Sequence, residues 1–154
     1  MANYAAMPTL ATTGPTPSTT AATAGIIKVD QGATLSSITI YQWAIGPHAN
    51  SADENYTVRL KRQTTAGTWT ATTPNPTDAH SGACTATAGF TSTAAGTAGV
   101  ELGRYGYHMR GGYLYTSIPG GEFLVLLAAA AGIILEYIFA QGTSVQDPTI
   151  WFRE

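Results

Sequence analysis

The stretch FLVLLAAAAGIILEYIFA, residues 123–140, is the most apolar part of the chain and decides which folds are open to it. A membrane-spanning helix needs about 20 predominantly apolar residues with few charges. Here the uncharged run ends at Leu135 because Glu136 follows it, and no basic anchor flanks the stretch. The pattern argues against a membrane span and for segments inside a folded domain.

Within this stretch, residues 133–139 have the alternation of a β-strand. Successive side chains of a strand point to opposite faces. One face then carries Ile133, Leu135, Tyr137 and Phe139, and the other carries Ile134, Glu136 and Ile138. The second face is apolar except for one carboxylate, and exposed to water it would favour association. We expect a second sheet or another subunit to cover it, which makes Ile134, Glu136 and Ile138 candidate interface residues.

Other segments of the chain also alternate, most clearly residues 56–63. In residues 37–45 the alternation places Ile38 and Ile40 on one face and Tyr41, Trp43 and Ile45 on the other. The full set of expected strands is 26–29, 37–45, 56–63, 68–73, 100–109, 111–118, 122–127 and 133–139. Short strands separated by glycine- and proline-rich turns predict an all-β protein, a single-domain, jelly-roll-like β-sandwich over residues 26–154.

The first 25 residues differ in composition from the rest. Residues 8–25 are rich in threonine and alanine, carry Pro15 and Pro17, and show no apolar period. We therefore predict an extended N-terminal arm over residues 1–25. Such an arm is either a frayed terminus or a segment that becomes ordered against a neighbouring subunit, and the second alternative makes Pro15 and Pro17 candidate interface residues.

Composition limits the functions that the chain can have. Charged residues make up 10% and the net charge is −2, which argues against nucleic-acid binding. A single cysteine, Cys84, leaves no internal disulfide. The first residues lack the basic and apolar regions of a secretory signal.

No catalytic or metal-binding signature is visible, and we expect no catalytic residue, metal or cofactor. The histidines His48, His80 and His108 are scattered, and Asp78, His80 and Cys84 match no standard zinc spacing. The acidic residues form no evident pair of the kind that a glycosidase uses. An enzyme is therefore not predicted.

The aromatic residues permit two interpretations. Trp43, Trp69, Tyr105, Tyr107, Tyr113, Tyr115 and Trp151 are interspersed with polar residues. They either pack in a core that is poor in leucine or form a sugar-binding platform or interface anchors. If they form a platform or anchors, Trp151 is a candidate interface residue.

One segment resembles a known family. VRLKRQTTAGTWTATTPNPTDAH, residues 58–80, is similar to a segment of small structural proteins of tailed bacteriophages, in which V-x-L-x-R precedes T-x-x-G-T and a TP-containing loop with Asp. The Gly-Gly strand at 111–115, the Pro-Gly-Gly turn leading to Glu122 and a closing strand near the C-terminus also fit.

This resemblance implies a jelly-roll-like sandwich in a virion, made in the host cytoplasm. Such proteins often act as capsid decoration (cement) proteins, so the implied partners are the major capsid protein and two further copies in a homotrimer, with no nucleic acid or membrane bound. A carbohydrate- or receptor-binding module of a phage tail or fibre is the alternative, with Trp69 and Tyr113 as candidate sugar contacts. Fold analogy alone does not decide between them.

Overall fold

A computed structural model describes residues 1–8, 25–31, 37–47, 53–65, 67–79, 81–94, 96–108, 110–126, 132–139 and 146–154. The strands are β1 (Asn3–Ala6), β2 (Gly25–Asp30), β3 (Ser37–Pro47), β4 (Asn55–Gln63), β5 (Thr68–Thr72), β6 (Asn75–Pro76), β7 (Thr87–Ala94), β8 (Ala98–His108), β9 (Tyr113–Thr116), β10 (Phe123–Leu126), β11 (Gly132–Phe139) and β12 (Gln146–Arg153). These residues form no helix, and hence none that is long and apolar enough to cross a membrane.

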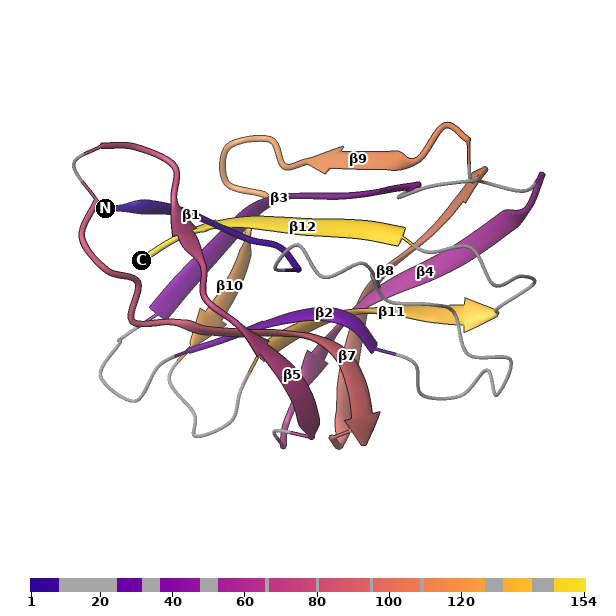
Figure 1. Cartoon of the computed structure of the whole chain (residues 1–154), viewed down its shortest axis with the longest axis horizontal. Coiled ribbons are helices and arrows are strands. Elements are labelled where there is room, and N and C mark those ends of the chain that lie inside the picture. The colour runs from indigo at the N-terminus through magenta and orange to yellow at the C-terminus, as the bar shows by residue number, and fades with distance from the viewer. Residues whose placement is uncertain are drawn as a thin grey trace.

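The strands form two antiparallel sheets that face each other across one core (Figure 1). Sheet A has the order β10-β3-β12-β1-β6, and β9 also pairs with β3. Because β12 occupies one side of β3, β9 and β10 lie end to end along its other side. Sheet B has the order β5-β7-β2-β11-β4-β8. The predicted all-β, single-domain sandwich is confirmed, whereas its jelly-roll winding stays a prediction.

Alternating apolar residues of both sheets build the core, as their sequence pattern predicts. The fully buried side chains include Ile27, Val29, Ile38, Ile40, Trp43, Leu60, Ile133, Leu135, Ile150 and Phe152. Burying a side chain of this size contributes about 1.5–3 kcal/mol relative to leaving it exposed.

The expected division of β3 into two faces is wrong. Ile38, Ile40, Trp43 and Ile45 are all buried in the core. The register against β12 shifts so that Trp151 pairs with Gln42 and Phe152 pairs with Ile40, which leaves Tyr41 as an extra residue. Such a β-bulge reverses the alternation, and sequence periodicity alone does not reveal it.

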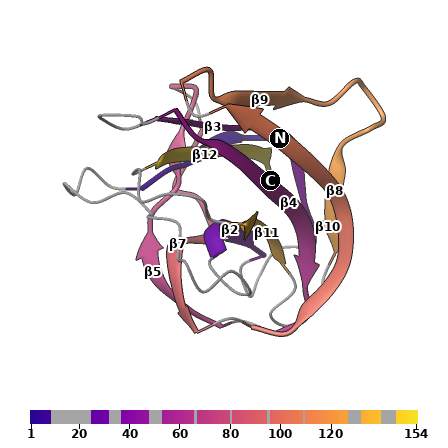
Figure 2. The same cartoon turned by 90° about the vertical axis from the view of Figure 1, so that its right-hand side faces the viewer.

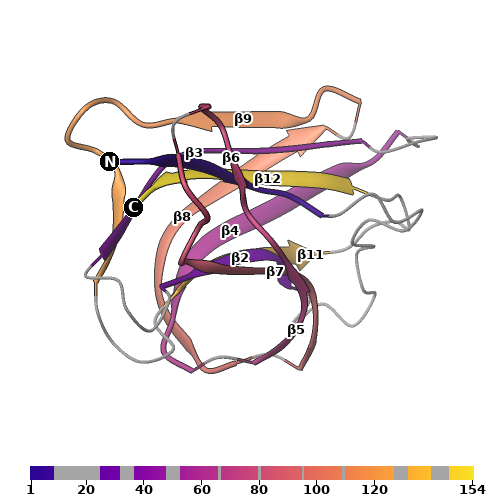
Figure 3. The ribbon, with the colours of Figure 1, turned by 60° about the vertical axis from the view of Figure 1, so that its left-hand side comes forward.

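Sheet B is strongly curled. The strands β7 and β8 are four inter-strand spacings apart, about 19 Å in a flat sheet, yet four Cα steps from Ala94 to Ala98 reach about 14 Å. The end of β7 and the start of β8 must therefore approach each other, which requires sheet B to bend. The β4–β5 and β7–β8 connections meet where Thr64 N donates to Thr97 O over 3.0 Å. Figures 2 and 3 show the resulting ring of strands below sheet A.

The prediction that the extended N-terminal arm begins at residue 1 is wrong, because the first residues belong to the folded domain. β1 lies between β12 and β6 in sheet A, and Tyr4, Ala5 and Ala6 are buried. Ala2 N donates to Glu154 O, so the two ends of the chain lie together. The sequence gives little sign of this strand because only four residues form it. Pro15 and Pro17 lie outside the described residues.

A second strand, β7, forms where only a simple threonine- and alanine-rich segment is evident. Its small residues have a packing role, because Gly89 lies under Trp69, and a Cβ atom at Gly89 would be 2.7 Å from Trp69 Cβ. Trp69 belongs to β5, the neighbouring strand of the sheet, and the composition of residues 87–94 does not indicate that they pack against it.

Candidate interaction surface

The second face of β11 is covered by its own chain. Ile134 and Glu136 are each 3% exposed, and they lie on the inner side of the curl of sheet B. The prediction that these two residues form a subunit or capsid interface is therefore wrong. We expected a second sheet or another subunit to provide the cover, but the curl of sheet B provides it. Ile138, on the same strand, is half-buried, and its interface role stays a prediction.

Inside the curl, charged side chains are paired. The Glu136 carboxylate accepts from Arg59 Nε and, over 2.7 Å, from Lys61 Nζ. Lys28 pairs with Asp30 on the neighbouring strand β2. Burial raises the pKa of the Asp30 carboxyl, and the bond from Lys28 opposes that rise. Buried charges persist only when they are paired and hydrogen-bonded, so these contacts allow a polar interior.

Trp69, a candidate sugar contact, has a packing role in this interior. Its indole ring lies against Gly25 and Gly89, whose missing side chains leave room for it. Lys28 Nζ lies 5.6 Å from the ring centroid. The packing interpretation therefore applies to Trp69.

Tyr113, the other candidate sugar contact, belongs to an aromatic cluster between the sheets. Trp43 is fully buried at its centre, with ring centroids of Tyr105 and Tyr113 each at 5.0 Å and that of Tyr115 at 6.1 Å. These offset and edge-on contacts are typical of core packing. The cluster joins β3 and β9 of sheet A to β8 of sheet B.

The outer side of sheet A faces away from both interiors. Trp43 points into the core, and so do its pairing partners Ile150 and Tyr115, so the alternate residues of these strands point outward. We call this outer side the open face. Its described residues include Asn3, Thr39, Tyr41, Gln42, Ala44, Leu114, Thr116, Leu124, Asp147, Thr149, Trp151 and Arg153.

Tyr41, Trp151 and Arg153 form the centre of the open face. All three are half-buried, and the Arg153 guanidinium lies over the Tyr41 ring with Cζ 4.7 Å from its centroid. Ser117, just after β9, binds the bulge, since its N and Oγ donate to the Tyr41 carbonyl over 2.9 and 3.0 Å. Burial raises the pKa of the Tyr41 hydroxyl, and the Arg153 charge opposes that rise. The candidate residue Trp151 therefore lies at the centre of the open face.

An apolar rim follows the β9–β10 side of this surface. Leu114 and Leu124 project from β9 and β10 with 61% and 41% of their surface exposed, and Ile118, between these strands, is 77% exposed. Tryptophan, tyrosine and arginine are the residues most enriched at binding hot spots. The open face thus has the composition of a protein interface, although only Trp151 was singled out from the sequence.

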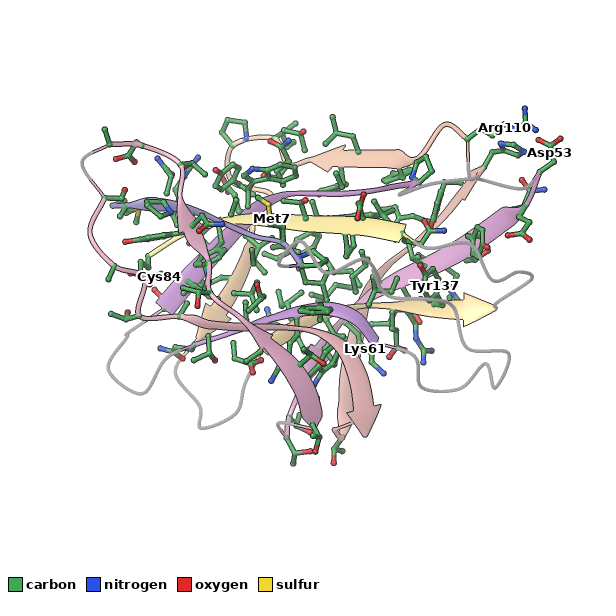
Figure 4. The ribbon with its side chains drawn as sticks, in the orientation of Figure 1. Met7, Asp53, Lys61, Cys84, Arg110 and Tyr137 are labelled. Atoms are coloured by element: carbon green, nitrogen blue, oxygen red, sulfur yellow. The ribbon has the colours of Figure 1, made fainter. Side chains whose placement is uncertain are left out.

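The described residues bring no catalytic group together. Cys84 and the Asp53–Arg110 ion pair (Nε to Oδ1, 2.7 Å) lie at opposite ends of the molecule (Figure 4). His108 is exposed, with Nε2 3.7 Å from Asp53 Oδ1. No cluster of three or more potential metal ligands occurs in the described part of the chain. His48 and His80 lie outside the described residues.

Cys84 is unsuited to act as a nucleophile. Burial, and secondarily the Glu154 carboxylate, raises the pKa of its thiol to about 12. Its Sγ lies 3.5 Å from Glu154 Oε2, and the same carboxylate accepts from the backbone N–H groups of Thr85 and Ala86. Because the thiolate is the reactive form, Cys84 is inert near neutral pH. The contacts of Glu154 instead attach the loop before β7 to the C-terminus.

Comparison with known proteins gives no relative. No protein-family model, no curated protein and no solved structure matches the chain.

Proposed function

We propose that this protein is a structural component of a virion, a capsid decoration (cement) protein that binds the outer surface of the shell through the open face of sheet A. Its partner is the major capsid protein, and three copies associate as a homotrimer. A protein that binds only the assembled shell stabilises that state by mass action, and contacts to several capsomers add avidity.

The open face is the observation that supports this proposal. Of the four sheet faces formed by the described strands, two line the core and a third turns into the curl of sheet B. The fourth carries Tyr41, Trp151 and Arg153 beside an apolar rim, with little charge. Apolar residues grouped in this way on a folded protein mark an interaction surface.

A binding experiment with shells tests the proposal. Shells assembled from the major capsid protein of the same virus are mixed with the protein and sedimented. We expect wild-type protein to co-sediment and Leu114→Glu to lose at least tenfold in affinity. Val100→Glu is the matched control, because Val100 is 69% exposed but lies on β8 of sheet B. Absence of wild-type binding, or equal losses for both variants, would contradict the proposal.

A carbohydrate- or receptor-binding module of a phage tail or fibre is the second candidate. It is favoured by the half-buried rings of Tyr41 and Trp151, since aromatic rings beside polar groups can stack on sugars. Binding on a glycan array that is lost in Trp151→Ala and kept in Trp69→Phe would favour this candidate over capsid attachment.

A further inference from the structure

Arg153 differs from the other cations in its pairing. Of the seven lysine and arginine residues, five contact a carboxylate within the described chain and a sixth, Arg62, donates to the Leu124 carbonyl over 2.8 Å. The five are Lys28, Arg59, Lys61, Arg104 and Arg110. Arg153 alone has neither kind of partner among the described residues, and its guanidinium lies instead over the ring of Tyr41.

The position of Arg153 prepares it to bind an anion. The contact with the Tyr41 ring is a cation–π contact that uses no hydrogen bond, so it leaves the N–H donors of the guanidinium available. The half-buried setting lowers the solvent screening that weakens fully exposed ion pairs. A planar fork of donors matches the two oxygens of a carboxylate.

We infer that Arg153 is the charged anchor of the open face and that it binds a carboxylate side chain of the capsid protein when the face docks. This inference rests on the proposed function. The uncharged and apolar surroundings supply contact area, and the single cation sets orientation, because a partner without an acid at this point would bury Arg153 unpaired.

A second copy of this chain fits the open face less well. The neighbouring acid, Glu154, is already bonded to Thr85 and Ala86. The acid that β12 carries on the open face is Asp147, six residues from Arg153 and thus about 20 Å away. Asp147 of one copy would reach Arg153 of a second copy only if the two open faces met with their β12 strands antiparallel.

The test compares variants in the shell-binding experiment. We expect Arg153→Gln to weaken binding 10- to 100-fold, and Arg153→Lys to weaken it less because the charge remains while the planar fork is lost. Arg110→Gln, which removes an arginine at a distant end of the molecule, is the control and should bind as wild type does. Wild-type binding with Arg153→Gln within twofold of it would overturn the inference and leave the proposed function intact, whereas absence of wild-type binding would overturn both.

A second measurement changes the shell and uses the same protein variants. Carboxylates on the shells are converted to neutral amides with a carbodiimide and glycinamide, and shell integrity is checked by electron microscopy. We expect wild-type binding to fall at least tenfold on amidated shells, and Arg153→Gln binding to change little. Equal wild-type binding to treated and untreated shells would overturn the inference. Self-association that disappears in Arg153→Gln, measured by light scattering, would instead assign the anchor to a second copy.

Discussion

Glu136 shows how much of this fold can depend on one side chain. Its carboxylate, with 4% of the side chain exposed, pairs with both Arg59 and Lys61 inside the curl of sheet B. A carboxylate in an apolar strand is therefore a structural group here, although the sequence pattern suggested a contact with another subunit.

Replacing Glu136 with alanine should be severely destabilising. The change leaves two cations without their buried partner, which typically costs about 3–5 kcal/mol in the free energy of unfolding. Urea denaturation followed by circular dichroism measures this loss. Glu101→Ala is the matched control, because Glu101 also binds two arginines but is exposed, and its loss should be much smaller. Similar losses for the two variants would contradict a buried role for Glu136.

Cys84 should react slowly with iodoacetamide in the native protein. Its thiol pKa of about 12 means that the thiolate is scarce at pH 8 and stays scarce through pH 9. Unfolding in urea returns the pKa toward its ordinary value and should accelerate alkylation many-fold. Mass spectrometry over a time course gives both rates. Fast native alkylation at pH 8 would show that burial and Glu154 do not protect the thiol.

At the scale of elements, β1 is integral to sheet A. Tyr4, 2% exposed, stacks on Phe152 with ring centroids 5.7 Å apart, and its hydroxyl donates to Gly82 O. Tyr4→Ala should therefore destabilise the protein by about 3–5 kcal/mol, the range for losing a buried aromatic side chain. Met7→Ala is the control, because the Met7 side chain is exposed and its loss should change the urea midpoint little. If both variants unfold as wild type does, the terminal segment is a dispensable arm.

The contact between β5 and β7 depends on a residue without a side chain. Gly89→Ala introduces a methyl group 2.7 Å from Trp69 Cβ and 3.2 Å from the Thr70 carbonyl oxygen, so we expect a loss of about 1–3 kcal/mol from overpacking. At Gly82 an added Cβ meets nothing within 4 Å, which makes Gly82→Ala the control. Thermal unfolding of both variants decides the point, and a smaller loss at Gly89 than at Gly82 would show that the indole ring is not held there.

For the whole molecule, one sheet borders two interiors. Sheet B lines the core on one side with residues such as Leu135 and surrounds the polar cluster on the other with residues such as Glu136. The curl and the sandwich therefore share their strands and should unfold together.

Single-tryptophan variants test this coupling. Trp43 reports on the core and Trp69 on the curl, so variants that keep only one of them, with the others replaced by phenylalanine, separate the two signals. We expect each variant to show a single urea midpoint by fluorescence that coincides with its own circular dichroism midpoint. A Trp69 signal that changes well before the circular dichroism would show that the curl opens independently.

The sequence alone determines the fold class and much of the core. Alternation correctly predicts the strands around Leu60 and Leu135 and their buried faces, because burying one side of a strand requires a period of two.

The tertiary structure alone decides which surface is open. Whether Ile134 faces solvent depends on the curl of sheet B, which is set by which strands the short connections join. The outward position of Tyr41 depends on a one-residue register shift against β12. Both are properties of pairing between residues distant in the chain. Local periodicity specifies that a strand has two faces, but only the arrangement of the sheets determines what each face meets.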